Sequence, residues 1–337
     1  MQPSDVKELE WSISAWSRLT ADAGKLPHAL LIHGPRGVGK LALATRFARF
    51  VLCEASAGRP CGRCDACRWF GDGNHPDFRL LQPEALAPEE EGDEAGSDEP
   101  GPSRKRKPSL EIKVDQVRAL ADFLYVGSHR GSRRVALIHP AEAMNLNAAN
   151  ALLKGLEEPP PAAMFILVAH DPARLLPTVR SRCVRLALGM PDADAALRWL
   201  EAEGVQNAAA WLAFAGGAPL LAREYASGER AAERLRIQEA LLAGNGPSLA
   251  INDRESLELL LEVLQKHACD LAFGVLAGRP KYGSAGRVPV SRVSPAALLA
   301  FAGDMGRARD MARKPLNPRL FAAELLTRYM ELSSVKA

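Results

Sequence analysis

Residues 34–41 read GPRGVGKL, and they match the phosphate-binding pattern G-x-x-x-x-G-K-[S/T] at every fixed position except the last. A short apolar run, Ala29-Leu30-Leu31-Ile32, comes before this loop, and Leu41 to Leu52 carry apolar residues at helical spacing after it. A strand, a glycine loop and a helix in this order form the setting in which backbone N–H groups hold a phosphate. We therefore predict an α/β core whose degenerate phosphate-binding loop contains Gly34, Gly37, Gly39 and Lys40.

The last position of the pattern lacks a ligand that nucleotide hydrolysis needs. Leu41 stands where a serine or threonine hydroxyl would bind the Mg²⁺ that bridges the nucleotide phosphates. A leucine side chain offers no oxygen to this hard cation. We therefore expect no functional magnesium site here, while weak nucleotide or phosphate binding through Lys40 and the loop N–H groups stays open.

The acidic half of a magnesium site is missing as well. A P-loop ATPase places an acidic residue at the end of a neighbouring strand to hold Mg²⁺. Here His139 and Pro140 follow the apolar run 135–138, and Glu142 lies further on, where capping a helix start is its expected use. Two independent losses of this kind predict a chain without ATPase activity of its own.

The cysteines point to a metal. Four of the six lie close together in the sequence, and in a reducing compartment such a cluster is more typical of a metal site than of disulfides. Four thiolates with no open position describe a structural Zn²⁺ site. An iron–sulfur cluster and ordinary buried cysteines are the alternatives, His75 would be a fifth ligand, and Cys269 has the character of a core thiol. The predicted ligands are Cys53, Cys61, Cys64 and Cys67.

Composition excludes several classes of protein. Hydrophobic residues make up 47% and charged residues 25% of the 337 residues, as in ordinary globular proteins, and a net charge of +3 creates no global field for nucleic acid. The first eleven residues contain three acidic residues and no apolar run, so we expect no secretory signal. The stretch from Glu258 to Leu276 is interrupted by charges and cannot span a bilayer. We therefore expect a cytoplasmic protein.

The chain divides into regions of different composition. The apolar runs 135–138 and 165–169 resemble central strands of a parallel sheet, and Ala143 to Glu158 is predicted to form a helix between them. Residues 84–109 are acidic, then basic, with almost no apolar content, which predicts a disordered insertion. A tolerated surface loop is its simplest interpretation, although the basic run 104–107 could also contact DNA phosphates or a partner. From about Asp192 onward, helical patterns dominate.

Several exact strings resemble the clamp-loader AAA+ subunits of bacterial DNA polymerase III, and within that family its delta-prime members. They cover about residues 25 to 190, and their combination is highly specific. These strings are His28-Ala29-Leu30-Leu31, the four-cysteine insertion, His75-Pro76-Asp77, Asn150-Ala151-Leu152-Leu153-Lys154-Gly155-Leu156-Glu157-Glu158-Pro159-Pro160, Asp171-Pro172, Leu176-Pro177 and Ser181-Arg182-Cys183.

The resemblance implies a domain plan. It implies an AAA+ P-loop domain at 1–188 with a zinc module at 53–67, a small helical lid at 189–232, and an all-helical oligomerisation domain or collar at 233–337. It also implies a hetero-pentamer with gamma/tau and delta subunits, which loads the sliding clamp on primed DNA within a DNA-directed DNA polymerase (nucleotidyltransferase) holoenzyme.

The resemblance also implies which residues act. In the hydrolysing gamma/tau members a threonine and an arginine act as sensors, and their positions match Ala169-His170 and Pro219 here; a proline cannot reach a phosphate. Delta-prime members act as rigid, non-hydrolysing stators. Arg182 would be an arginine finger, working in trans on the ATP of a neighbouring gamma/tau subunit.

Two other functions compete with this interpretation. An active gamma/tau-like ATPase, or another AAA+ remodeller, would hydrolyse ATP as a lone chain. A zinc-dependent DNA-binding module is disfavoured, because the cysteine cluster lacks the following histidine pair and the pattern of a recognition helix.

Overall fold

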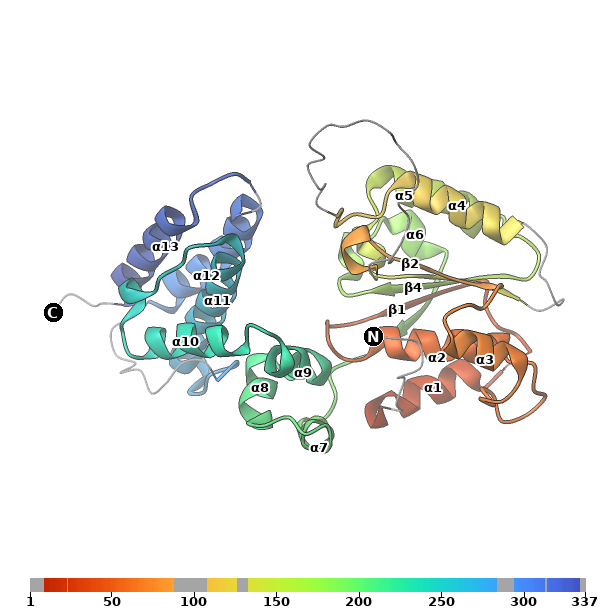
Figure 1. The fold of residues 1–337 in the computed structure, drawn as a ribbon, viewed down its shortest axis with the longest axis horizontal. Helices are drawn as coiled ribbons and strands as arrows, with labels where there is room; N and C mark the ends of the chain where they lie inside the picture. The colour runs from red at the N-terminus through yellow and green to blue at the C-terminus, as the bar shows by residue number, and fades with distance from the viewer. Residues whose placement is uncertain are drawn as a thin grey trace, which may run out of the picture. The chain divides into compact units, whose positions relative to one another are not determined.

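The chain folds into two compact units, Met1–Met190 and Pro191–Ala337 (Figure 1). The predicted border between residues 188 and 189 falls two residues before this division. The computed structural model describes residues 9–22, 24–87, 108–125, 133–283, 294–312 and 314–333.

The first unit is built on a five-stranded, all-parallel sheet with the order β2-β3-β4-β1-β5. Every residue of β3 and β4 is buried, which explains why their sequences are apolar except for Arg134, the first residue of β3. The α/β core with a parallel sheet is therefore confirmed, including the three predicted apolar strands. The strands are β1 (Ala29–His33), β2 (Phe78–Leu81), β3 (Arg134–Ile138), β4 (Ala163–Ala169) and β5 (Val184–Ala187).

Helices cover both faces of this sheet (Figure 1). Successive side chains of a strand point to opposite faces, so Leu31 joins one buried cluster and Leu30 and Ile32 join the other. The helices of one face supply Leu120 and Leu152, among others, and those of the other face supply Phe47. The first group is α4 (Val114–Tyr125), α5 (Leu146–Glu157) and α6 (Pro177–Ser181), and the second is α1 (Ile13–Thr20), α2 (Lys40–Leu52) and α3 (Asp65–Gly71).

Two predicted segments differ from the structure at their ends. The helix predicted to start at Ala143 begins three residues later, because the side chain of Asn145 caps α5 by accepting the N–H of Ala148. The predicted insertion begins with a 3₁₀ turn, Glu84–Leu86, and Glu84 pairs with Lys113 at 2.7 Å. Its residues 88–107, including the basic run, lie outside the described residues.

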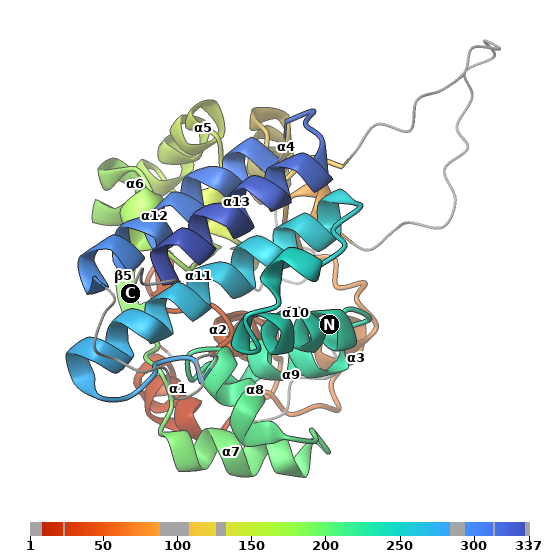
Figure 2. The ribbon, with the colours of Figure 1, turned by 90° about the vertical axis from the view of Figure 1, so that its left-hand side faces the viewer.

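Helices joined by short loops make up the described residues of the second unit, which contain no strand. Figure 2 shows α11, α12 and α13 lying side by side. One buried apolar cluster extends from Ala196 to Tyr329 and includes residues of both the predicted lid and the predicted collar. The division between lid and collar at 232/233 therefore stays a prediction. None of the helices in the described ranges has the length and the apolar character of a membrane-spanning segment. The helices are α7 (Ala193–Ala202), α8 (Ala208–Phe214), α9 (Pro219–Ser227), α10 (Ala231–Leu242), α11 (Arg254–Ala277), α12 (Pro295–Ala312) and α13 (Pro318–Ser333).

Candidate functional site

The glycine loop connects β1 to α2 as predicted. Gly37 and Gly39 have φ angles of 79° and 95°, in the left-handed region that favours glycine, and Gly39 caps the start of α2. Gly34 has a different constraint: a Cβ atom at this position would lie 2.0 Å from the carbonyl oxygen of Leu188. The close approach of two backbone segments thus requires glycine at residue 34, independently of any bound phosphate.

Lys40 lies buried at the start of α2, with 2% of its surface exposed. Its Nζ donates a hydrogen bond of 2.5 Å to the carbonyl oxygen of Pro35, within the loop itself. Burial lowers the pKa of Lys40 to about 8; Glu142 opposes this shift, while Arg36 adds to it. In this structure the lysine that would contact a nucleotide phosphate therefore binds its own loop.

Two histidines occupy the strand ends where an ATPase needs oxygen ligands and a polar sensor. His139 follows β3, His170 follows β4, and their ring centroids lie 5.2 Å apart. Burial, with the nearby charge of Lys40, lowers the pKa of His139 to about 4 and that of His170 to about 3. Both rings are consequently neutral near pH 7, and imidazole nitrogens are poor ligands for a hard cation such as Mg²⁺.

Glu142 has a different role from the one expected. It was predicted to cap a helix start, but its Oε1 accepts the backbone N–H groups of His170 (2.8 Å) and Asp171 (3.2 Å), beyond the end of β4. The carboxylate thus ties the ends of two adjacent strands together and lies near Lys40. Sequence reasoning could not find this contact, because nearly thirty residues separate the partners.

Arg182 lies at the C-terminal end of α6, with 35% of its side chain exposed. Its Nη2 pairs with Oε1 of Glu157 at 2.6 Å, and its Nη1 donates to the carbonyl oxygen of Thr178 at 3.0 Å. The next residue, Cys183, is buried, its thiol donates to the carbonyl oxygen of Val179 at 3.3 Å, and burial raises its pKa to about 11. Cys183 is therefore an inert packing residue that fixes the backbone beside the arginine.

The four predicted metal ligands come together. Their Sγ atoms all lie within 4.8 Å of one another, and those of Cys53 and Cys64 are 3.9 Å apart. A tetrahedral Zn²⁺ with Zn–S bonds of about 2.3 Å sets neighbouring sulfurs about 3.8 Å apart, so the cluster fits such an ion. Backbone N–H groups, first that of Arg63 and then that of Cys64, lower the pKa of Cys61 to about 6, whereas burial raises the pKa of Cys67 to about 12. The fit to a metal therefore rests on the sulfur geometry and not on these pKa shifts.

His75 is not part of this cluster. Its Nδ1 accepts the backbone N–H of Asp77 at 3.1 Å, and its ring packs edge-on against Trp69 and Phe70 of α3. Asp77 in turn pairs with Arg134 of β3 at 3.2 Å, with only 2% and 6% of the two side chains exposed. The sequence His-Pro-Asp thus attaches the cysteine module to the sheet, a role that its motif did not reveal.

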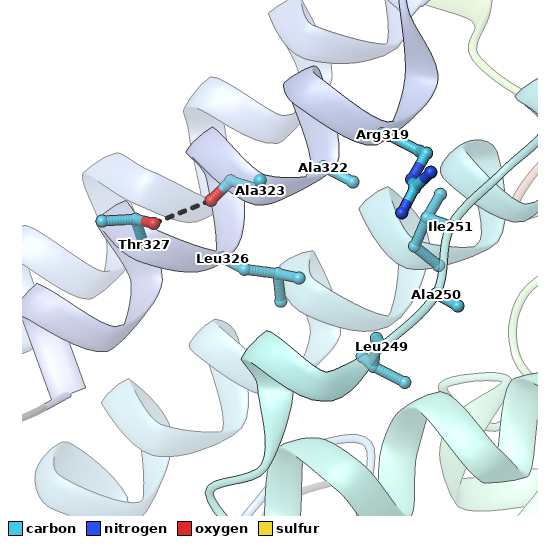
Figure 3. Close-up of a pocket in the computed structure, with 8 residues that line it drawn as sticks. All are labelled: Leu249, Ala250, Ile251, Arg319, Ala322, Ala323, Leu326 and Thr327. Carbon is cyan, nitrogen blue, oxygen red and sulfur yellow. Dashed lines mark hydrogen bonds between the residues drawn. The ribbon is translucent and has the colours of Figure 1, made fainter.

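The helical unit contains a pocket of about 240 Å³ between α13 and the segment before α11 (Figure 3). Its lining is mostly aliphatic, with one charged residue, so it offers no set of groups for acid–base or metal chemistry. The lining residues are Leu249, Ala250, Ile251, Arg319, Ala322, Ala323, Leu326 and Thr327.

Comparisons with known proteins agree with the motifs. A family model described as "DNA polymerase III, delta subunit" matches residues 13–192. DNA polymerase III subunit delta' of Pseudomonas aeruginosa is 42% identical over 219 residues, which span 63% of this chain and 60% of that protein. The subunit delta' of Escherichia coli (strain K12) is 30% identical over 339 residues, which span 94% of both chains.

A solved structure is also similar. It is that of a DNA polymerase III gamma subunit-related protein from Thermotoga maritima, which is 17% identical and covers 95% of this chain and 99% of its own, with a TM-score of 0.46. A similarity at this level carries no conclusion about function. The family model matches more than half of this chain and the E. coli alignment spans nearly all of it, so the chain belongs to the DNA polymerase III delta' family.

Proposed function

We propose that this chain is a non-hydrolysing delta' subunit of a DNA polymerase III clamp loader. It joins gamma/tau and delta subunits in a hetero-pentamer that places the sliding clamp on primed DNA, and it lends Arg182 to the ATP site of a neighbouring gamma/tau subunit. One observation carries this proposal: partly buried, neutral histidines, His139 and His170, stand at the strand ends where a hydrolysing subunit needs acidic and polar groups.

The contribution of Arg182 would be electrostatic. A guanidinium group aimed at a γ-phosphate stabilises the charge that develops as the bond breaks, and arginine fingers in general contribute roughly 10³ to 10⁵ in rate. Arg182 suits this task because its side chain is partly exposed at a helix end and its neighbour Cys183 is anchored in the core.

We also propose that the four-cysteine cluster holds a structural Zn²⁺. The sulfur spacing and the four thiol donors support this ion, which would tie the loop after α2 to the start of α3. An iron–sulfur cluster is the alternative, and metal analysis together with the visible absorption spectrum of the purified protein separates the two.

ATP turnover tests the proposal. We expect no hydrolysis by the lone chain with ATP, Mg²⁺ and primed DNA, because its loop lacks the ligands for the metal. In a complex reconstituted with a gamma-type subunit, Arg182→Ala should remove the share of turnover that belongs to the adjacent site, while assembly on a sizing column stays unchanged.

The matched control is Arg174→Ala, which removes an exposed arginine of the preceding 3₁₀ turn. It should leave turnover at the wild-type level. Hydrolysis by the lone chain would favour the active gamma/tau-like ATPase instead, and equal turnover of the Arg182→Ala and wild-type complexes would contradict the finger assignment.

A further inference from the structure

Glu157 is an acidic residue at an unfavourable place. It is the last residue of α5, and Glu158 follows it as the C-cap. The C-terminal end of a helix carries a partial negative charge, so a carboxylate there is disfavoured. A side chain at such a position needs a compensating partner, and Glu157 has one in Arg182 at 2.6 Å.

The next residue, Glu158, is also acidic and provides a natural comparison. The carboxylate of Glu158 makes no hydrogen bond or ion pair with any residue that the structure describes, although it is adjacent and chemically identical. Only Glu157 reaches the arginine that we assign as the finger. The contact is therefore specific to one of two neighbouring carboxylates.

The pairing leaves part of the guanidinium free. Nη2 binds Glu157, and Nη1 donates to the carbonyl oxygen of Thr178 and approaches Oγ of Ser181 at 3.4 Å. The structure gives Nε no acceptor among the described residues, and the side chain is 35% exposed. A guanidinium held through its terminal nitrogens can still donate from Nε and from the second hydrogen of Nη2 to an incoming phosphate.

We infer that Glu157 is a positioning residue: its carboxylate holds the guanidinium of Arg182 in the orientation in which it meets the neighbour's phosphate. An arginine side chain has many rotamers, and an unrestrained finger would lose much of this conformational entropy on each encounter. Three acceptors from α5 and α6 reduce that loss beforehand. This inference rests on the proposed function, because it assigns a role toward the same finger.

The pair can be broken without unfolding the chain. The side chains of Arg182 and Glu157 are 35% and 47% exposed, and an ion pair this exposed contributes little to stability. Glu157→Gln should therefore fold and assemble normally. We expect it to lower kcat at the adjacent ATP site roughly tenfold, with KM for ATP unchanged, because misplacing a catalytic group by about 1 Å can cost up to 10²-fold in rate.

The experiment measures kcat and KM of the reconstituted complex for wild type, Arg182→Ala, Glu157→Gln, the double variant and the matched control Glu158→Gln. Support requires three results: Glu157→Gln lowers kcat, Glu158→Gln does not, and Glu157→Gln has no further effect when Arg182 is already alanine. Partial recovery of kcat by Glu157→Asp would add support, because the shorter acid keeps the charge but loses reach.

The outcomes separate the inference from the proposed function. If Arg182→Ala leaves turnover unchanged, the finger assignment fails and the inference fails with it. If Arg182→Ala lowers turnover while Glu157→Gln matches Glu158→Gln, the finger stands and the positioning role is overturned. A higher kcat for Glu157→Gln would also overturn it, because Glu157 would then restrain the finger.

Discussion

The buried ammonium of Lys40 costs the folded chain stability. Burial lowers its pKa to about 8, so the folded chain resists charging this group while the unfolded chain does not. The penalty is fully present below pH 8 and disappears as the pH rises toward the ordinary lysine pKa of about 10.4. Lys40 occupies the position of a phosphate-binding lysine, yet its burial lowers the stability of a chain that we propose does not hydrolyse ATP.

Replacing this lysine should stabilise the protein. We expect Lys40→Met to raise the free energy of unfolding by about 1–2 kcal/mol at pH 7, since the loss of the hydrogen bond to Pro35 offsets part of the gain. The gain should shrink between pH 8 and pH 10. Urea unfolding at pH 7 and at pH 10 measures this gain in stability. Lys25→Met, at an exposed lysine, is the control. A gain that is independent of pH would contradict the explanation.

At the scale of single elements, the cysteine module depends on its proposed ion. Cys64 supplies a sulfur to the cluster, caps α3 and accepts the N–H of Cys67 at 3.4 Å, so Cys64→Ser should release the metal and loosen α3. Metal content per chain and hydrogen exchange of residues 53–71 measure this. Cys269→Ser, in the helical unit and outside the cluster, is the control and should keep the metal. Native protein without bound zinc would remove the zinc proposal.

The elements also show how far sequence patterns reach. The buried strands β1, β3 and β4 could be predicted from their apolar runs, whereas β2 and β5 could not, because each has only one buried residue and lies at an edge of the sheet. The four cysteines could be grouped because their spacing is local. The contacts of Glu142, Glu157 and Asp77 could not be predicted, since the partner of each residue lies far along the chain and only the fold brings the two together.

At the scale of the whole molecule, the second unit contains a buried polar network. Glu262 accepts hydrogen bonds from Lys266 at 2.8 Å and from the hydroxyl of Tyr225, and Arg234 lies 3.6 Å from its second oxygen. Burial by itself would raise the pKa of Glu262, but the charge of Lys266 and these hydrogen bonds lower it. The network joins α9 and α10 to α11, across the predicted border between lid and collar.

This network predicts cooperative unfolding of the helical unit. Glu262→Ala leaves a cation without its partner, and we expect a loss of about 2–3 kcal/mol, less than for a fully buried pair because 17% and 13% of the two side chains are exposed. Native-state hydrogen exchange should show the same loss in the free energy of opening for α7–α9 as for α10–α13. Glu258→Ala, an exposed acid on the same helix, is the control. A loss confined to α7–α9 would mean that the segments unfold separately.

The tight contact between Gly34 and Leu188 changes how the sequences of relatives should be interpreted. A methyl group at residue 34 would collide with a main-chain oxygen, so selection on folding alone preserves this glycine. A survey that takes an intact glycine loop as evidence of ATP hydrolysis would therefore overestimate the number of active ATPases among such chains. Variation at positions 40 and 41, which this collision does not constrain, is the better guide.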